Sequence, residues 1–234
     1  DGNLMEADYA QLEFRVAAFL SQDPVAMAEI AEGFDVHSFT AATLTEAGEP
    51  TSRQEAKSHT FKPLYGGITG TPAQVKYYTD FLKKYSRIDE WQEEMCTTAV
   101  KTKKVRIPSG REYSFPTASR NPKNLKVSPK TKIVNYPVQG FATGDIVPLG
   151  MVELSKEMKK ADVKSLMVLT VHDSILIDVY PGEEQQMAKM MRDTMSGVRD
   201  VMKTRWGVDF NIDLPVDIKM GPNWMDTKEV IIDS

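Results

Sequence analysis

The sequence predicts an α+β protein in which a small group of antiparallel strands accompanies a mainly helical region. Two observations lead to this prediction. Two pairs of β-rich runs are each joined by a short turn, and most of the other residues show apolar positions at helical spacing. With 234 residues, of which 41% are hydrophobic, the chain can form one large or two small domains with a sizeable core.

The N-terminal half is predicted to be mostly helical after one short strand that ends at Asp8. The dipeptide Asp23-Pro24 ends the first helix, because a residue before proline avoids the helical conformation. Ser52 and Glu55 have the spacing of a capping box and predict a helix start. The elements expected here are a strand over 4–8 and helices over 11–20, 24–44 with an interruption at Gly33, 52–66 and 71–101.

The helix expected over 52–66 carries the most informative spacing in the chain. Arg53, Lys57, Phe61 and Tyr65 follow one another at intervals of four and form one stripe roughly 18 Å long. Cationic groups pair with phosphate oxygens and aromatic faces stack on a base, so this four-residue stripe could hold a nucleotide. An ordinary core helix is the alternative that spacing alone leaves open. Pro63 predicts a kink before Tyr65.

The C-terminal half contains both predicted hairpins. Pro108-Ser109-Gly110 joins the first pair of runs, and His172-Asp173-Ser174 joins the second, which has the strongest strand signals of the chain. Strands are expected over 104–107, 111–115, 165–171, 175–180 and 214–220, and helices over 132–159, with Pro137 and Pro148 as kinks, and over 183–206, with a methionine-rich core face.

Charge is distributed unevenly along the chain. The net charge is −4, yet residues 101–132 contain ten basic residues against one acid, Glu112. A local basic surface of this kind suits a nucleic-acid backbone, although a solvated loop region is the alternative. The single cysteine, Cys96, excludes an internal disulfide. Without a long apolar run or a signal-peptide pattern, we expect a cytoplasmic protein with no membrane partner.

Asp8 and Asp173 are the candidate metal ligands. Each lies at the end of an expected strand, and Mg²⁺ prefers carboxylate oxygens together with substrate phosphates. Two such ions can activate an attacking hydroxyl and stabilise a leaving pyrophosphate. For either residue alone, an ordinary turn aspartate remains the simpler interpretation.

Taken together, the motifs resemble those of the family A DNA polymerases of the bacterial polymerase I type. The segment Asp8-Tyr-Ala-Gln-Leu-Glu-Phe-Arg15 is similar to their first motif, DYSQIELR. The four-residue stripe followed by Gly66 resembles the second, and Val171-His172-Asp173 the third. Residues 135–145 resemble the NAPMQGTAAD segment, and residues 221–224 the C-terminal ending of the family. The resemblance therefore extends over nearly the whole chain.

The resemblance implies a role for each matching residue. Asp8, Asp173 and Lys57 would be catalytic, and two Mg²⁺ ions would bind Asp8, Asp173 and the Tyr9 carbonyl. Ser174 stands where many members have a second acid, which implies a site of two carboxylates. The nucleotide-binding residues would be Gln11, Glu13, His37, Arg53, Lys57, Phe61 and Tyr65, with Glu13 rejecting ribose, and the DNA-binding residues Arg15, Lys132, Asn135, Gln139 and His172.

The same resemblance implies a polymerase palm and fingers. Residues 1–23 and 126–234 would form the palm, an antiparallel sheet with helices, and residues 24–125 the mainly helical fingers. Because no part of the sequence matches a thumb, we expect a fragment or the C-terminal half of a split enzyme. Its partners would be primer-template DNA, a deoxynucleoside triphosphate and an N-terminal polymerase portion. A single-subunit RNA polymerase and a non-catalytic nucleic-acid-binding subunit are the alternatives.

Overall fold

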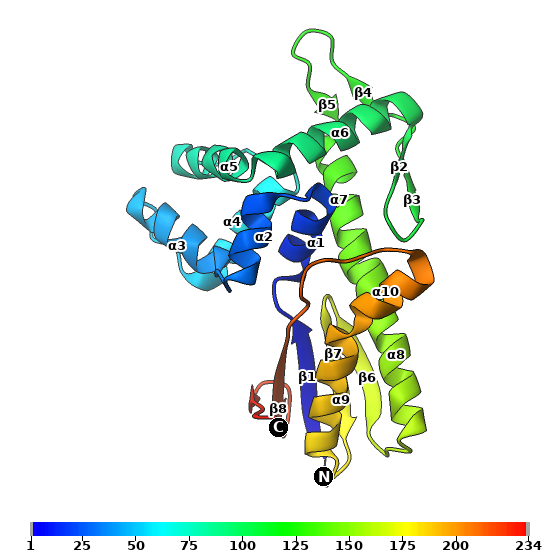
Figure 1. The fold of residues 1–234 in the computed structure, drawn as a ribbon. Coiled ribbons are helices and arrows are strands. Elements are labelled where there is room, and N and C mark those ends of the chain that lie inside the picture. The colour runs from blue at the N-terminus through cyan, green and yellow to red at the C-terminus, as the bar shows by residue number, and fades with distance from the viewer. Residues whose placement is uncertain (1, 233–234) are drawn as a thin grey trace. The chain divides into compact units, whose positions relative to one another are not determined.

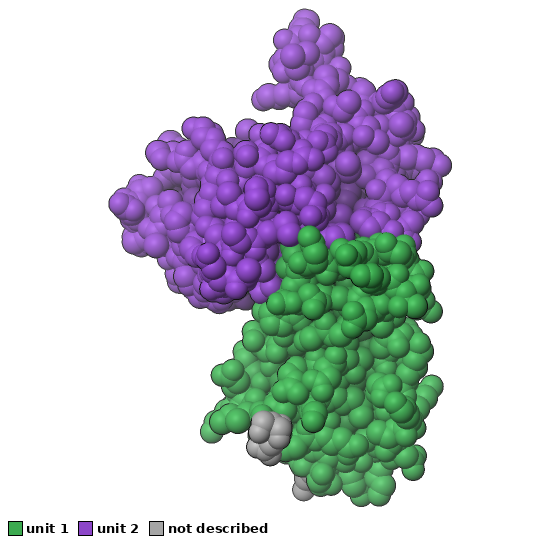
Figure 2. Space-filling view, in the orientation of Figure 1, with its two compact units in different colours: residues 1–12, 141–234 green, residues 13–140 purple. Residues whose placement is uncertain are grey.

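The computed structural model describes residues 2–232 of the chain (Figure 1). These residues form two compact units, which Figure 2 shows in different colours. The sheet unit comprises the described part of residues 1–12 and 141–234, and the helical unit comprises residues 13–140. The units divide after Leu12 and Gly140, and the expected palm and fingers, with boundaries at residues 23 and 125, stay a prediction. Residues 1, 233 and 234 of the predicted ranges lie outside the described residues.

The sheet unit is built on antiparallel strands in the order β6-β7-β1-β8-β9. Its central strand β1 alternates between the two faces: Met5, Ala7 and Tyr9 are buried, whereas Asp8 is exposed. This period of two is expected of a strand whose one face packs on a core. The strands are β1 (Asn3–Tyr9), β6 (Leu166–Val171), β7 (Ser174–Val179), β8 (Val216–Gly221) and β9 (Lys228–Glu229).

Helices α8 (Val147–Lys160), α9 (Glu184–Ser196) and α10 (Val198–Trp206) supply the rest of the core of this unit. The predicted methionine face is confirmed, because Met187, Met191, Met195 and Met202 are buried. The single helix expected over 183–206 is wrong in one respect, since it breaks at Gly197, which separates α9 from α10.

The backbone is helical from residue 130 to residue 160, as the expected helix over 132–159 required. It consists of α7 (Lys130–Phe141), a π-helical turn η1 (Ala142–Ile146) and α8. Pro137 lies inside α7, whereas Pro148 lies in the first turn of α8. Because the helix continues through this point, the missing N–H of Pro148 falls just after the wider π turn, where the hydrogen-bond pattern of the helix already changes.

In the helical unit, short polar residues fix the helix starts. Asp23, Asp35, Ser52 and Thr71 each accept hydrogen bonds from backbone N–H groups of the first turn that follows. Such caps satisfy donors that have no helical partner. The helices are α1 (Leu12–Ser21), whose first residue belongs to the sheet unit, α2 (Pro24–Ala31), α3 (Val36–Glu46), α4 (Arg53–Leu64), α5 (Pro72–Lys84) and α6 (Ser86–Thr102).

Tyr85 divides the helix expected over 71–101 into α5 and α6. Its side chain is fully buried, with its ring centroid 5.5 Å from that of Phe14 and 4.6 Å from that of Phe81. Its hydroxyl donates to Glu29 at 2.6 Å. At this break the buried ring therefore has aromatic contacts and its polar group has a hydrogen-bond partner. Periodicity could not show the break, because the apolar spacing continues across it.

The hairpin predicted around residues 108–110 is confirmed as β2 (Lys104–Arg106) and β3 (Glu112–Ser114). A second small hairpin, β4 (Ser119–Arg120) and β5 (Val127–Ser128), was not predicted. Each of its strands has two residues, which is too short for an alternating pattern to be recognised. Figure 1 shows this hairpin next to α6.

Candidate active site

Asp8 and Asp173 lie on neighbouring strand ends in the sheet unit. Asp8 pairs in register with Ser174 of β7, the residue directly after Asp173. The backbone N–H of Tyr9 donates to the carbonyl oxygen of Asp173 at 3.3 Å. Asp8 is exposed, and Asp173 is partly exposed. Backbone pairing therefore brings together two carboxylates that are 165 residues apart in sequence.

Both carboxylates fit a magnesium ion by their chemistry. Mg²⁺ takes oxygen ligands and is commonly held by one or two carboxylates plus phosphates and water. Asp217 of β8 pairs in register with Asp8 on the other side and was missed in the sequence. Among residues 2–232, however, no three His, Cys, Asp or Glu side chains are grouped so that they could hold a metal ion. Ser174 donates its hydroxyl to Val171 O at 3.1 Å and closes the turn.

Tyr9 fixes the end of β1 through its side chain. The ring is buried, and its hydroxyl donates to the backbone carbonyl of Met195 in α9 at 2.9 Å. Burial raises the pKa of this phenol far above its ordinary value. A Cβ atom at Gly150 of α8 would lie 3.0 Å from the hydroxyl oxygen, so the glycine leaves the ring the space it needs. The expected role of the Tyr9 carbonyl as a metal ligand stays a prediction.

Two predicted site residues have left-handed backbone conformations. His172 has φ 53° at the tip of the β6–β7 hairpin, and Gln11 has φ 53° just after β1. Residues other than glycine rarely adopt this region, and such conformations are concentrated at turns and functional sites. His172 is exposed and Gln11 half-buried. Each of the two candidate carboxylates thus lies near a residue with an unusual, left-handed backbone conformation.

The helical unit contains the four-residue stripe on α4. The capping box predicted at its start is present between Ser52 and Glu55. The helix runs through Pro63 and ends at Leu64, and the N–H of Tyr65 still donates to Phe61 O at 3.1 Å. The stripe is therefore maintained to its end. The kink expected at Pro63, which would re-aim Tyr65 relative to Arg53, stays a prediction.

The two aromatic residues of the stripe are stacked. The ring centroids of Phe61 and Tyr65 are 6.2 Å apart with an interplanar angle of 23°. The Tyr65 hydroxyl donates to the Glu13 carboxylate of α1. The three residues predicted to contact the incoming sugar and base are thus neighbours, although 52 positions separate Glu13 from Tyr65.

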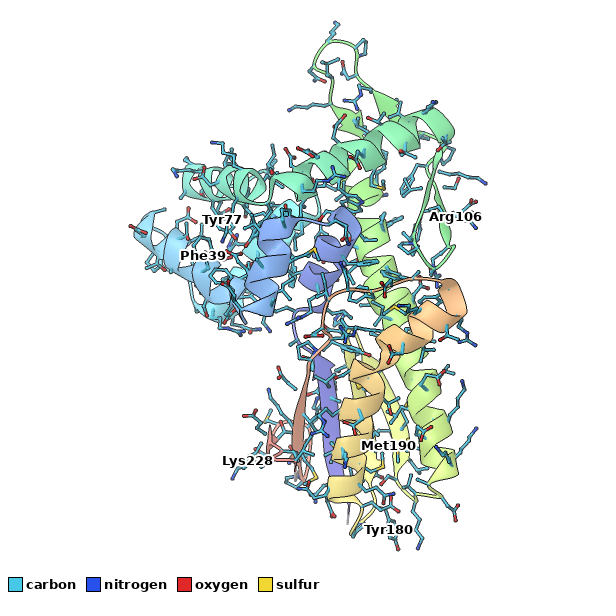
Figure 3. All side chains as sticks on the ribbon, viewed as in Figure 1. Phe39, Tyr77, Arg106, Tyr180, Met190 and Lys228 are labelled. Atoms are coloured by element: carbon cyan, nitrogen blue, oxygen red, sulfur yellow. The ribbon has the colours of Figure 1, made fainter. Side chains whose placement is uncertain are left out.

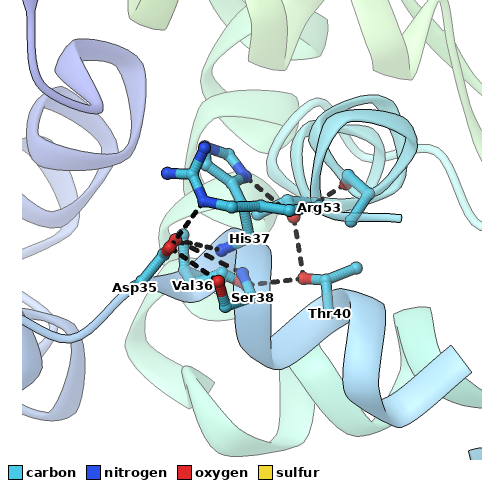
Figure 4. Close-up of polar contacts among 8 residues, drawn as sticks. Asp35, Val36, His37, Ser38, Thr40 and Arg53 are labelled. Atoms are coloured by element: carbon cyan, nitrogen blue, oxygen red, sulfur yellow. Dashed lines mark hydrogen bonds and ion pairs between the residues drawn. The ribbon is translucent and has the colours of Figure 1, made fainter. Parts of the chain in front are cut away.

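Asp35, which precedes α3, organises the phosphate-binding candidates and was missed in the sequence. Its Oδ2 accepts a hydrogen bond from Arg53 Nε at 2.6 Å, and Figure 4 shows this pair beside His37. Burial alone would raise the pKa of the Asp35 carboxyl, but hydrogen bonds from Arg53 and Ser38 hold it well below its ordinary value. The signal that could have revealed it is an aspartate at the N-cap position, directly before the helix start.

His37 is buried on α3 and neutral at physiological pH. Burial lowers its pKa to about 4, because the positive form would lose hydration, and the charges of Arg53 and Lys57 act in the same direction. Its Nδ1 lies 3.2 Å from Thr60 Oγ1, and its ring centroid is 5.2 Å from that of Phe61. His37 is therefore held against the middle of α4.

Gln92 of α6 holds the C-terminal end of α4 and was also missed. Its Nε2 donates to Pro63 O at 2.8 Å and to Leu64 O at 3.1 Å. The side chain is fully buried, so the two last carbonyl groups of α4 are satisfied away from water. A glutamine inside an amphipathic helix gives no sequence signal for this role.

The predicted DNA-binding residues of the helical unit differ in exposure. Lys132 and Gln139 are exposed, whereas Arg15 is buried. Asn135 is half-buried, and its Oδ1 is a buried acceptor without a hydrogen-bond partner among the described residues. The roles of these residues, and of His172 in the sheet unit, stay predictions.

Part of the basic segment 101–132 is used within the protein. Lys103 donates to Ala118 O at 2.5 Å, Lys104 pairs with Glu112 at 3.1 Å, and Arg120 pairs with Glu93. Other cations of the segment are exposed and have no ion-pair partner among residues 2–232; they include Lys101, Lys123, Lys126 and Lys132. Fewer cations are therefore available to a polyanion than the ten basic residues of this segment.

The predicted site residues divide between the two units. Asp8, Tyr9, Gln11, His172 and Asp173 belong to the sheet unit. The phosphate-binding candidates, the aromatic pair and the other DNA-binding candidates belong to the helical unit. Within residues 2–232, no helix has the length and apolar character needed to cross a membrane.

Comparisons with known proteins agree with the resemblance seen in the motifs. The model of DNA polymerase family A matches residues 1–226. DNA polymerase I of Mycobacterium leprae is 27% identical over 231 residues, which are 93% of this chain and 24% of that protein. DNA polymerase I of Lactococcus lactis is 28% identical, covering 97% of this chain and 26% of that protein. The chain spans about a quarter of the length of these curated relatives.

A solved structure has the same fold. The POL domain of Pol1 from M. smegmatis, in complex with DNA primer-template and dNTP, aligns with a TM-score of 0.76 at 23% identity. The alignment covers 96% of this chain and 40% of that one. This likeness confirms the α+β fold class predicted from the sequence.

Proposed function

Because the chain belongs to DNA polymerase family A, we propose that it carries the nucleotidyl-transfer site of a template-directed DNA polymerase. The observation that carries this proposal is the pairing of β1 with β7, which brings Asp8 beside Asp173. In the proposed reaction, the 3′-hydroxyl oxygen of a primer attacks the α-phosphorus of a deoxynucleoside triphosphate. A new phosphodiester bond forms, pyrophosphate leaves, and the hydroxyl proton is lost to the surroundings.

The sheet unit would supply the carboxylates and correspond to the palm. Asp8 and Asp173 would hold two Mg²⁺ ions, with the Tyr9 carbonyl as a further ligand. When bound, these ions would favour the ionised 3′-hydroxyl and offset the negative charge of the triphosphate. The buried Tyr9 ring supports this arrangement, because it fixes the strand end from which Asp8 projects.

The helical unit would bind the nucleotide and correspond to the fingers. Arg53, Lys57 and His37 would contact the triphosphate, and Lys57 would stabilise charge on the leaving group. The stacked rings of Phe61 and Tyr65 would pack on the sugar and base. Glu13, held by Tyr65, would close the space beside the 2′ position and exclude ribose. Gln11, which belongs to the sheet unit, would be a further nucleotide-binding residue.

Primer-template DNA would be the second substrate. Arg15, Lys132, Asn135, Gln139 and His172 would be its contacts. The unpartnered Oδ1 of Asn135 supports a ligand at that position, because a buried acceptor without a partner is costly. Contacts on the minor-groove side would check pair geometry, since the acceptors there are similar for every base pair. A cytoplasmic location, as expected for an enzyme that acts on bacterial or phage DNA, is part of the proposal.

We also propose that this portion acts together with an N-terminal polymerase portion that provides a thumb and the rest of the palm. The edge strand β6 exposes Leu166 to 63%, Val168 to 51% and Leu169 to 44%. Tyr180, which is labelled in Figure 3, lines a surface hollow of about 430 Å³ together with Leu166 of this strand. An unpaired edge with exposed aliphatic side chains is normally covered by another segment. The greater length of the relatives supports such a partner.

Primer extension with and without that N-terminal portion tests the proposal. We expect extension of a primer by the combined portions, and at least a 10³-fold loss of rate in Asp173→Asn while DNA binding is retained. Asp162→Asn is the control, because Asp162 is an exposed aspartate of the same unit that does not line the surface hollow at Tyr180. Unchanged extension in Asp173→Asn would contradict the catalytic assignment. DNA binding without extension in the combined wild type would favour a non-catalytic subunit.

A further inference from the structure

Asp35 accepts four hydrogen bonds with its two carboxylate oxygens (Figure 4). Oδ1 accepts from the backbone N–H groups of His37 at 3.1 Å and Ser38 at 3.3 Å. Oδ2 accepts from the Ser38 hydroxyl at 2.7 Å and from Arg53 Nε at 2.6 Å. Three of these donors belong to the first turn of α3. The carboxylate is therefore fixed by α3 and presents one oxygen to Arg53.

The contact through Nε has a consequence for the rest of the Arg53 side chain. A guanidinium group is planar, so fixing Nε limits the directions in which the two terminal amino groups can point. Neither Nη1 nor Nη2 has a hydrogen-bond partner among the described residues, and the side chain is 52% exposed. These two nitrogens form the fork that pairs with two phosphate oxygens at once. Asp35 thus holds Arg53 and leaves that fork available.

We propose that Asp35 is a positioning residue that orients the Arg53 fork toward the terminal phosphates of an incoming nucleoside triphosphate. This inference rests on the proposed function. Without Asp35, the long side chain of Arg53 would have to be ordered when the triphosphate binds, and that ordering would weaken binding. The same turn of α3 carries His37, which Thr60 holds by its Nδ1. Two of the phosphate-binding candidates are then set by one short segment.

A comparison with Asp23 separates this role from helix capping. Asp23 caps α2 with one oxygen, as Asp35 caps α3, but its other oxygen accepts from the backbone N–H groups of Arg87 and Ile88. Capping therefore needs no guanidinium partner. The second oxygen of Asp35 is the part that bonds to Arg53, and a substitution at Asp35 can remove this interaction and keep the cap.

The test is the affinity of the full chain for dATP and for deoxyadenosine, measured by calorimetric titration. Asp35→Asn keeps a good capping oxygen but replaces the acceptor for Arg53 by an amide. We expect dATP to bind about 2- to 10-fold more weakly, with deoxyadenosine binding and the thermal midpoint unchanged. Asp80→Asn is the matched control: it removes the same charge from a carboxylate on α5 that pairs with Lys76 and Lys83. It should bind dATP as the wild type does.

A second comparison ties the effect to Arg53. In an Arg53→Lys background, which lacks Nε, Asp35→Asn should cause no further loss of dATP affinity. Should Asp35→Asn fold poorly, Asp35→Ser retains a capping oxygen and is expected to show the same selective loss. Equal or tighter dATP binding in the capped variants would overturn the positioning role and leave the proposed function intact. If the wild type bound dATP no better than deoxyadenosine, both would be overturned.

Discussion

In the sheet unit, Asp8 and Asp173 are brought together by backbone pairing between strands, whereas in the helical unit Arg53 and Tyr65 are held by bonds that their own side chains make. The strand register is maintained by many backbone groups, none of which depends on a particular side chain. The Arg53 and Tyr65 positions depend on Asp35 and Glu13. We therefore expect carboxylate spacing to tolerate substitution nearby, and nucleotide recognition to be sensitive to single side chains.

Helix α4 illustrates how such side-chain support is distributed. Asp35 contacts its first residue, His37 bonds to Thr60 in its middle, and Gln92 bonds to the carbonyl groups at its end. Three side chains from two segments, the start of α3 and the middle of α6, thus hold the helix that carries the stripe. Removal of one of these three side chains should displace only the part of the stripe that this side chain holds.

Among the tests of this contrast, the largest effect is expected from Glu13→Ala, which removes the carboxylate that Tyr65 bonds to. The space beside the 2′ position would open, so discrimination against ribonucleotides should fall by about 10²-fold. The measurement is the ratio of kcat/KM for a deoxyribonucleotide to that for the matching ribonucleotide in primer extension. Glu46→Ala, an exposed glutamate on α3, is the control. A wild type that uses both nucleotides equally would instead favour the RNA polymerase alternative.

The next effect concerns pH and His37. The folded protein keeps this imidazole neutral down to about pH 4, whereas the unfolded chain binds the proton near its ordinary pKa of 6.5. Between these values the unfolded state holds more protons, so the free energy of unfolding should fall as the pH drops from 6.5 to 4, by at most about 3 kcal/mol. The unfolding free energy, measured by urea unfolding at several pH values in this range, should depend less steeply on pH in His37→Gln. The same pH dependence of the unfolding free energy in the variant and the wild type would contradict the assignment to His37.

Gln92→Ala should destabilise the chain by about 2 kcal/mol. The substitution removes the donor of the Leu64 carbonyl in a buried place, whereas the Pro63 carbonyl keeps its bond from the N–H of Gly66. Because these groups end the helix that carries Tyr65, the KM for the nucleotide should rise as well. Urea unfolding and primer-extension kinetics measure the two effects, with Gln54→Ala, an exposed glutamine of α4, as the control. A loss of stability with KM unchanged would restrict Gln92 to a structural role.

Tyr9→Phe is expected to have the smallest effect and to sharpen the contrast between the units. It removes the hydrogen bond to Met195 O and should cost about 1 kcal/mol of unfolding free energy. The register of β1 with β7 would persist, so kcat should remain near the wild-type value. A strong fall in kcat with little change in stability would mean that side-chain anchoring also positions the carboxylates in the sheet unit.

Much of the secondary structure could be predicted because it depends on neighbouring residues. The capping box at Ser52 and the turn around Pro108 act over three or four positions, and both are present. Failures occurred where distant residues decide the backbone. Tyr85 lies at the break between α5 and α6, where its ring contacts Phe14 of α1 and its hydroxyl bonds to Glu29 of α2, 56 positions away.

The sequence by itself determined the fold class, the motifs and the identity of the candidate residues, since these depend on residue type and short-range spacing. Tertiary structure decided which of them meet. Asp8 with Asp173, Tyr65 with Glu13, and Arg53 with Asp35 are each joined by folding across long stretches of chain. Such pairings arise from strand register and helix packing, which the whole core sets cooperatively. A local pattern therefore identifies a candidate ligand, and only the packed core supplies its partner.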